Sequence, residues 1–401
     1  MQAMNRRAWL QASMMATTGL MLGGCATSTG QLSARGTGDL GVIIGRADGT
    51  LTLVETSERT VLGTVEGLGD LSHASVVFSR DGLYAYVFGR DGGLTKVNIL
   101  TARIEKRVMQ AGNSIGGAIS ADGTLVAAQN YKPGGVKVFN AHTLELVADI
   151  PATYGDGQLS RVVGLVDLPG QRFAYSLFDA DAIWVVDCSD LKAVQTQKFE
   201  QVGRQPYDAL VTPNGRHYIA GLFGEDGLAM VDLWQPQPKV QRILSGYGKG
   251  EAPLPVYKMP HLRGWAVAGR HAYLPAIGRH EVLVVDTETW REVGRIPVAG
   301  QPVFVMARPD GRQVWVNFAV PDYHRVQVID TQTRQIVKTL EPGKAVLHME
   351  FTPRGETVWI SSRDVDRVSV VDTASFETLS ALKVKAPSGI FMTSRAARMG
   401  F

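Results

Sequence analysis

Hydrophobic and polar positions alternate over short stretches along most of the chain, and each stretch ends at a turn. Alternation with a period of two predicts β-strands that bury one face. The first turn of successive stretches carries a glycine, at Asp81-Gly82, Asp122-Gly123, Pro169-Gly170, Asn214-Gly215, Asp310-Gly311 and Arg354-Gly355. Glycine supplies the positive φ that tight hairpins need. The pattern therefore predicts a protein built from antiparallel hairpins.

The hairpins repeat at a spacing of roughly 43 residues, the length of one four-stranded propeller blade. The third strand of successive repeats ends in Val-Asp or Ile-Asp, at Asp187, Asp232, Asp286, Asp330 and Asp372. An aspartate there can accept hydrogen bonds from the backbone of the following turn. One such sheet cannot bury both of its faces alone, so the repeats must stack on one another.

Seven full repeats begin near Ser72, Asn113, Ser160, Gln205, Pro260, Gln301 and Ala345. Residues 41–69 supply the outer strands of one further repeat, and the segment from Pro387 to Arg395 supplies its inner strand. Pairing of the two chain ends removes the open sheet edges. We therefore expect an all-β, eight-bladed β-propeller over residues 40–401, with seven blades as the alternative count.

The N-terminus has the pattern of an export signal. The positively charged Arg6 and Arg7 precede a short apolar stretch from Ala8 to Leu22, which is too short to span a membrane. Leu22-Gly23-Gly24-Cys25 resembles a lipobox, which predicts a signal peptide over residues 1–24 and acylation of Cys25. Residues 25–39 then form a flexible linker. The alternative is an ordinary cleaved signal with a chance cysteine.

These features predict a periplasmic protein held by a lipid anchor. Ala26 follows the lipobox cysteine in place of an aspartate, which favours the outer membrane. Arg6 and Arg7 also resemble a weak twin-arginine signal, so the Sec and twin-arginine routes both stay open. Cys188 is the second of only two cysteines, so lipidation of Cys25 excludes an internal disulfide. We expect Cys188 to be a buried structural thiol, the alternative being a reactive one.

Charge and motifs narrow the function. The net charge of +3 gives no reason to expect a nucleic-acid partner. The chain has no Cys-x-x-Cys-His, P-loop, dinucleotide fingerprint or Gly-x-Ser-x-Gly motif. Any redox chemistry must therefore come from a non-covalent ligand or from a partner.

The blade repeat predicts which residues surround the mouth of the propeller. The inner strands all begin on one face of the propeller. Their first residues place on that face His73, Ser114, Arg161, Pro206, Tyr207, His261, Val303, His348 and Ser388. The loops between second and third strands open on the same face and add Arg46, Arg90, Tyr131, Asp179, Arg279, Tyr323 and Arg363. Histidine can ligate a metal or move protons, and arginine binds carboxylates in bidentate fashion. Such a ring suits a flat polyanion that carries a metal.

Each of these residues also has a structural explanation. A histidine beside a strand is often only a hydrogen-bonding residue, and a loop arginine is often a solvated charge. We expect structural roles for the remaining histidines, His142, His217, His271, His280 and His324. Asp156, in the loop Tyr154-Gly155-Asp156-Gly157, is either a general base at the mouth or a turn former.

Leu71 to Asn98, with the sequence LSHASVVFSRDGLYAYVFGRDGGLTKVN, resembles the first blade of the haem d1 domain of cytochrome nitrite reductases. The match continues more weakly to the C-terminus. The resemblance implies that His73 is the proximal iron ligand and that His261 matches the first of two distal histidines. Gln301-Pro302-Val303 stands in place of the second. That departure argues against nitrite reduction, because protonation of the leaving oxygen needs donors over the iron.

A lipoprotein leader stands where those reductases carry a cytochrome c domain, a combination that resembles haem d1 biosynthesis proteins. The resemblance implies non-covalent binding of haem d1 or a late precursor such as dihydro-haem d1, an iron tetrapyrrole. His73 then ligates iron, His261 and Asp156 line the opposite side, and Arg90 with its neighbours holds carboxylates. Its partners are other biosynthesis proteins and nitrite reductase, and a homodimer stays open.

Three hypotheses follow for the function. The first is a protein that modifies the tetrapyrrole, by oxidation of the macrocycle or of a side chain. The second is a carrier that does no chemistry. The third is a propeller that serves only as an interaction scaffold.

Overall fold

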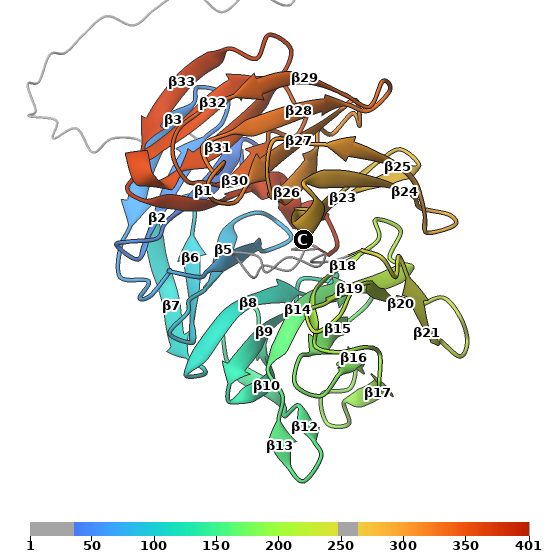
Figure 1. The fold of residues 1–401 in the computed structure, drawn as a ribbon. Helices are drawn as coiled ribbons and strands as arrows, with labels where there is room; N and C mark the ends of the chain where they lie inside the picture. The colour runs from blue at the N-terminus through green and yellow to red at the C-terminus, as the bar shows by residue number, and fades with distance from the viewer. Residues whose placement is uncertain (1–35, 248–263, 401) are drawn as a thin grey trace, which may run out of the picture. The chain divides into compact units, whose positions relative to one another are not determined.

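The computed structural model describes residues 36–247 and 264–400, so Cys25 and His261 lie outside the described residues. The described part forms eight four-stranded antiparallel sheets arranged around a ring (Figure 1). The expected all-β, eight-bladed propeller is thereby confirmed. Within the described residues, no helix has the length and apolar character needed to cross a membrane.

Each blade runs from the axis outward through four strands. The innermost strands are β4 (Ser75–Phe78), β8 (Asn113–Ile119), β14 (Val162–Leu168), β18 (Pro206–Val211), β22 (Ala266–Ala268), β26 (Pro302–Ala307), β30 (Val346–Phe351) and β34 (Pro387–Met392). The second strands are β5 (Tyr84–Phe88), β9 (Leu125–Lys132), β15 (Arg172–Leu177), β19 (His217–Leu222), β23 (His271–Ala276), β27 (Gln313–Phe318), β31 (Thr357–Ser362) and β1 (Leu40–Gly45).

The outer half of each blade is the less buried half. The third strands are β6 (Gly93–Asn98), β10 (Gly134–Asn140), β16 (Ala182–Asp187), β20 (Leu228–Asp232), β24 (Glu281–Asp286), β28 (Val326–Asp330), β32 (Arg367–Asp372) and β2 (Thr50–Glu55). The outermost strands are β7 (Arg103–Met109), β11 (Leu146–Ile150), β17 (Gln195–Phe199), β21 (Val240–Ile243), β25 (Arg291–Pro297), β29 (Gln335–Leu340), β33 (Thr378–Lys383) and β3 (Thr60–Val65). Most residues of the third strands are buried, whereas the outermost strands are largely exposed.

The repeated turn residues fix the ends of the strands. All six turn glycines have a positive φ, between 70° and 79°. The Asp286 carboxylate accepts hydrogen bonds from the backbone N–H groups of Glu288 and Thr289 at 3.1 and 2.8 Å. Asp330 and Asp372 repeat this arrangement in the next two blades. Short-range contacts therefore set the blade period.

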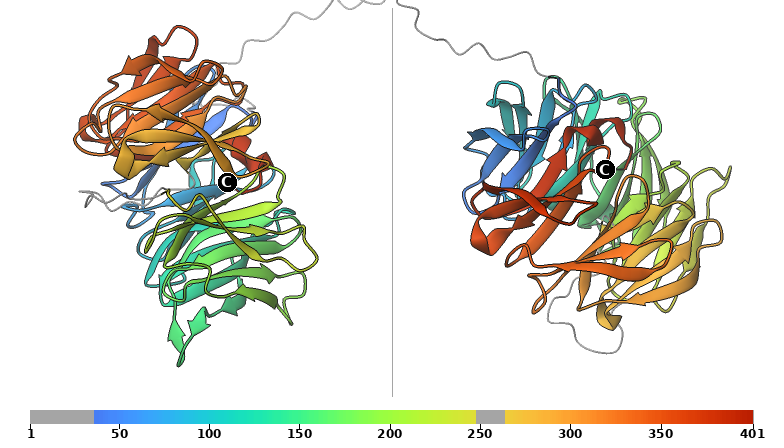
Figure 2. Two further views of the ribbon diagram at one scale, coloured as in Figure 1. Left: turned by 45° about the vertical axis from the view of Figure 1, so that its right-hand side comes forward. Right: turned by 90° about the horizontal axis from the view of Figure 1, so that it is seen from above.

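The eighth blade joins the two ends of the chain. Its innermost strand β34 pairs with β1, with Val42 opposite Phe391 and Ile43 opposite Ile390. Figure 2 shows the blue N-terminal strands beside the red C-terminal strands. The predicted closure is confirmed, and it removes the open edges that a split blade would leave.

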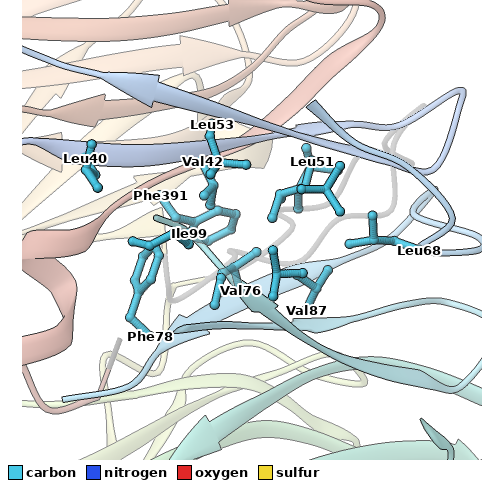
Figure 3. Close-up of a cluster of buried hydrophobic side chains, with 14 of the residues drawn as sticks. Leu40, Val42, Leu51, Leu53, Leu68, Val76, Phe78, Val87, Ile99 and Phe391 are labelled. Carbon is cyan, nitrogen blue, oxygen red and sulfur yellow. The ribbon is translucent and has the colours of Figure 1, made fainter. Parts of the chain in front are cut away.

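The hydrophobic core lies between neighbouring blades. Where the eighth blade meets the first, Leu51 and Leu53 of β2 pack in one cluster with Val76 and Phe78 of β4 and with Phe391 (Figure 3). Burial of each such side chain stabilises the fold by about 1.5–3 kcal/mol. Because every blade shares its apolar faces with two neighbours, the ring holds the inner strands at fixed positions around the axis.

Candidate functional site

An open cavity of about 470 Å³ lies beside the starts of the inner strands of blades one, six, seven and eight. Its lining includes the predicted mouth residues His73, Val303, His348 and Ser388 and the loop residues Arg46, Tyr323 and Arg363. Small-molecule sites typically have about 300–1,000 Å³. The cavity therefore has the size of a ligand site and gathers seven of the predicted side chains.

His73 stands just before β4, and its side chain is exposed on the cavity wall. The blade register places it there because the chain enters the inner strand from this face. A ligand in the cavity can therefore reach the imidazole of His73. Its assignment as an iron ligand stays a prediction.

Three arginines from equivalent loops carry positive charge to this side of the mouth. Burial lowers the pKa of the half-buried Arg46, and the nearby cations of Arg363 and Arg90 lower it further, while Asp70 opposes them. Arg363 itself donates from Nε to the Asp364 carboxylate at 2.7 Å. Cations that repel one another favour a bound anion, and the planar guanidinium fork matches a carboxylate.

His348 of β30 lies deeper in the wall, half-buried. Its Nδ1 accepts a hydrogen bond from the backbone N–H of Ile390 at 3.2 Å. The ring stacks on Phe391 with centroids 5.7 Å apart and meets Phe304 edge-on at 5.8 Å. Burial, with a smaller effect of the Arg395 charge, lowers the pKa of His348 to about 3. The imidazole is therefore neutral across the physiological range.

Four more predicted residues, from blades two, three and four, form a second group. The hydroxyl groups of Tyr207 and Tyr131 are 3.0 Å apart, and Tyr207 packs against Phe178. Arg161 lies over the Phe178 ring at 4.2 Å and pairs with Asp179 at 2.5 Å. Burial raises the pKa of both tyrosines. Arg90 connects the groups, since its charge acts on Arg46 and on both tyrosines.

Asp156 and Arg279 belong to neither the cavity lining nor the second group. Asp156 is exposed at the tip of a small hairpin formed by β12 (Thr153–Tyr154) and β13 (Gln158–Leu159), which extends beyond the blades in Figure 1. Arg279 is exposed in the short 3₁₀ helix η2 (Ile277–Arg279) of blade five. Their roles stay predictions. So do the roles of His261 and Cys25, which lie outside the described residues.

The sequence analysis missed apolar and amide residues of the same wall. Phe304 and Phe318 line the cavity, as does Asn317. Asn317 accepts a hydrogen bond from the Phe304 N–H at 2.9 Å and donates to the Val346 carbonyl at 2.9 Å, so it fixes the ends of two inner strands. Phe304 directly follows the predicted mouth residue Val303, and that adjacency was the available signal.

Other titratable groups fit structural roles. Cys188 is buried, as expected, and burial raises the pKa of its thiol to about 11. Within the part of the chain that the structure describes, no three His, Cys, Asp or Glu side chains gather as a metal site.

Comparisons with known proteins identify the family of the chain. The family described as cytochrome D1 heme domain matches residues 35–396. Protein NirF of Stutzerimonas stutzeri is 61% identical over 379 residues, which cover 94% of this chain and 97% of that protein. Dihydro-heme d1 dehydrogenase of Pseudomonas aeruginosa is 29% identical over 326 residues, 79% of this chain and 64% of that protein.

A solved structure shows the same fold. It is described as dihydro-heme d1 dehydrogenase NirN in complex with DHE, and it matches with a TM-score of 0.79 and 24% identity over 92% of this chain and 78% of that chain. The family match spans the whole propeller, and the identity to NirF extends over nearly the full length of both proteins. The chain belongs to the cytochrome d1 haem domain family and, within that family, to the NirF proteins.

Proposed function

We propose that this protein binds a late haem d1 precursor, such as dihydro-haem d1, non-covalently in the mouth cavity during haem d1 biosynthesis. One observation carries the proposal: His73 lines the same cavity as the cations of Arg46 and Arg363. An iron tetrapyrrole with acidic side chains needs one axial nitrogen and several cations. Membership of the NirF proteins supports the same function.

The residues of the cavity fit such a group. The His73 imidazole offers a nitrogen to iron, while Phe304, Phe318 and Val346 offer apolar surface to a flat ring. Arg46 and Arg363 would hold carboxylates. When bound, an iron tetrapyrrole supplies the electron-transfer capacity that the side chains of the cavity lack. The chain itself binds and orients the ring and limits its contact with water.

Titration with ferric and reduced dihydro-haem d1 and haem d1, followed by visible spectroscopy, tests this proposal. We expect a saturable spectral shift with the wild-type protein, and His73→Ala should abolish its iron-ligand component. His142→Ala is the matched control, since His142 is an exposed histidine that does not line the cavity. Absence of any shift with the wild type would leave only the interaction scaffold.

Modification of the bound precursor is a second candidate function. The similarity to a dihydro-heme d1 dehydrogenase supports it. Removal of two hydrogens from a side chain releases two electrons and two protons, so the reaction mixture must contain an electron acceptor. Mass spectrometry of dihydro-haem d1 before and after incubation with protein and ferricyanide distinguishes an enzyme that modifies the precursor from a carrier. A loss of two hydrogens indicates an enzyme, and an unchanged mass indicates a carrier.

The place of action is also part of the proposal. The lipobox and the linker after it support export to the periplasm and a lipid anchor on Cys25. Nitrite reductase and other haem d1 biosynthesis proteins are the partners that such a precursor-binding protein requires. Metabolic labelling with a fatty acid should mark the wild type and leave Cys25→Ala unlabelled.

A further inference from the structure

The hydrogen bonding of His348 determines which ring nitrogen carries the proton. A backbone N–H can only donate, so Nδ1, which faces the N–H of Ile390 at 3.2 Å, must present its lone pair. A neutral imidazole has one N–H, and here it lies on Nε2. A nitrogen that carries a proton cannot ligate iron.

The surroundings prevent the ring from turning over. Phe391 covers one face with an interplanar angle of 27°, and Phe304 meets the ring at 75°. The backbone is held by Ser361, whose Oγ accepts from the His348 N–H at 2.9 Å and donates to the His348 carbonyl at 3.2 Å. A flipped ring would leave the Ile390 N–H without its acceptor, which costs about as much as a lost hydrogen bond.

The positive charge of Arg395, beside Phe391, opposes a second proton on the His348 imidazole. The guanidinium of Arg395 lies 5.2 Å from the centroid of Phe391, on which His348 stacks. Arg395 pairs with the buried carboxylate of Glu350. An imidazolium would also direct an N–H at the N–H of Ile390. The strand that closes the ring, β34, therefore holds His348 in one neutral tautomer.

The remaining nitrogen is available to the cavity. Among the described residues, none forms a hydrogen bond with Nε2 of His348. This nitrogen is also absent from the set of buried polar atoms that lack a partner, so it is not sealed inside the protein. His348 lines the cavity that also receives His73, Arg46 and Arg363. A ligand in that cavity thus meets a fixed neutral donor beside two cations.

We propose that His348 determines specificity by donating Nε2–H to an oxygen acceptor, a carboxylate or a ring carbonyl, at the edge of the bound tetrapyrrole, and that it is not an iron ligand. This inference rests on the proposed function and assigns one more residue to the same site. The arginines supply charge from flexible side chains, whereas His348 supplies one directional bond from a rigid position.

Two substitutions separate the donor from the packing. His348→Gln can keep an acceptor toward Ile390 and a donor toward the cavity, while His348→Phe keeps an aromatic ring on Phe391 and has no N–H. We expect His348→Phe to weaken the binding of ferric haem d1 roughly 10- to 100-fold if the acceptor is a carboxylate and about 2- to 10-fold if it is a carbonyl. The affinity of His348→Gln for ferric haem d1 should stay within about 3-fold of the wild-type affinity, a smaller change than the loss of one hydrogen bond to a charged group would cause.

The iron spectrum gives a second measurement. All His348 variants should keep the wild-type electron paramagnetic resonance signal of the bound ferric iron, whereas His73→Ala should change it. Haem d1 with its carboxylates methylated identifies the acceptor: a smaller penalty for His348→Phe indicates a carboxylate, and an unchanged penalty indicates a ring carbonyl. His142→Phe, at an exposed site, is the control.

Two results would overturn the inference: His348→Phe binding as tightly as the wild type, or a His348 variant changing the iron signal. Thermal melts of each variant show whether it is folded, and His348→Gln provides a second readout if His348→Phe is not. If the wild type binds neither haem d1 nor dihydro-haem d1, the proposed function itself fails. If the wild type binds and His73→Ala alone alters the iron signal and the affinity, only the role of His348 fails.

Discussion

Arg80 connects the C-terminal tail to three blades at the ends of the inner strands. Its guanidinium donates to the carbonyls of Ala396 and Arg398 at 3.0 and 2.9 Å, to that of Ile119 at 2.9 Å, and to the Asp167 carboxylate at 2.9 Å. The Asp167 side chain is only 2% exposed. We therefore predict that Arg80→Met destabilises the whole ring, because it leaves a buried carboxylate without its cation.

The size of the effect follows from burial. Loss of one partner of a buried ion pair costs about 3–5 kcal/mol. Arg80 is 23% exposed, so water can replace part of the loss and the lower end, about 3 kcal/mol, applies. With an m-value of about 3 kcal/mol/M, the urea midpoint should fall by about 1 M. Arg312→Met is the matched control, since the Arg312 side chain is 84% exposed and its nearest carboxylate is 3.9 Å away.

The pH dependence adds an independent check. Burial raises the pKa of Asp167, and removal of the cation should raise it further. A carboxyl whose folded pKa exceeds its unfolded value takes up its proton on folding, so stability rises as pH falls. The deficit of Arg80→Met should therefore be smaller at pH 5 than at pH 8, and Asp167→Asn should recover part of it. A cost equal to that of Arg312→Met would refute this reasoning.

Three further predictions concern the backbone, the thiol and the site histidine. Gly92→Ala should lower the free energy of unfolding in urea by about 2 kcal/mol or more, because φ is +83° and the new Cβ would clash with the Ala111 carbonyl. Gly67→Ala, with φ +82° and open space around the Cβ, should cost only about 1 kcal/mol, and equal costs would contradict this. Cys188 should resist a thiol reagent at pH 8 until the protein unfolds, since its thiol is buried; rapid labelling of Cys188 itself in the native protein would disprove it. Between about pH 6.5 and pH 4, His348 is protonated in the unfolded protein but neutral in the folded protein. The free energy of unfolding should therefore decrease by up to about 1.4 kcal/mol for each unit by which the pH is lowered over this range. His348→Phe should lack this contribution, and parallel stability curves for the two proteins would count against it.

The fold could be predicted because its signals are local. A glycine such as Gly82 sets the first turn of its blade, and an aspartate such as Asp286 accepts backbone hydrogen bonds within three residues. The closing blade followed from the two leftover ends, residues 41–69 and the segment from Pro387. Turn chemistry acts over a few residues, so one sequence suffices to read it.

The site could be predicted only in part. The blade register brought His73 and Arg363 to one cavity, because the repeat fixes where each inner strand and loop begins. The tautomer of His348 depends on a backbone N–H at Ile390, 42 residues away, and no periodicity signals such a contact. Asp156 was expected in a loop at the mouth, but local pairing of β12 with β13 places it at the tip of an exposed hairpin.

A crystal structure of the protein with bound haem d1 tests the central claim most directly. We predict electron density for the macrocycle in the cavity at the mouth, iron bonded to the imidazole of His73, and carboxylates beside Arg46 and Arg363. A macrocycle bound on the outer strands, or iron held by a residue outside this cavity, would contradict the account.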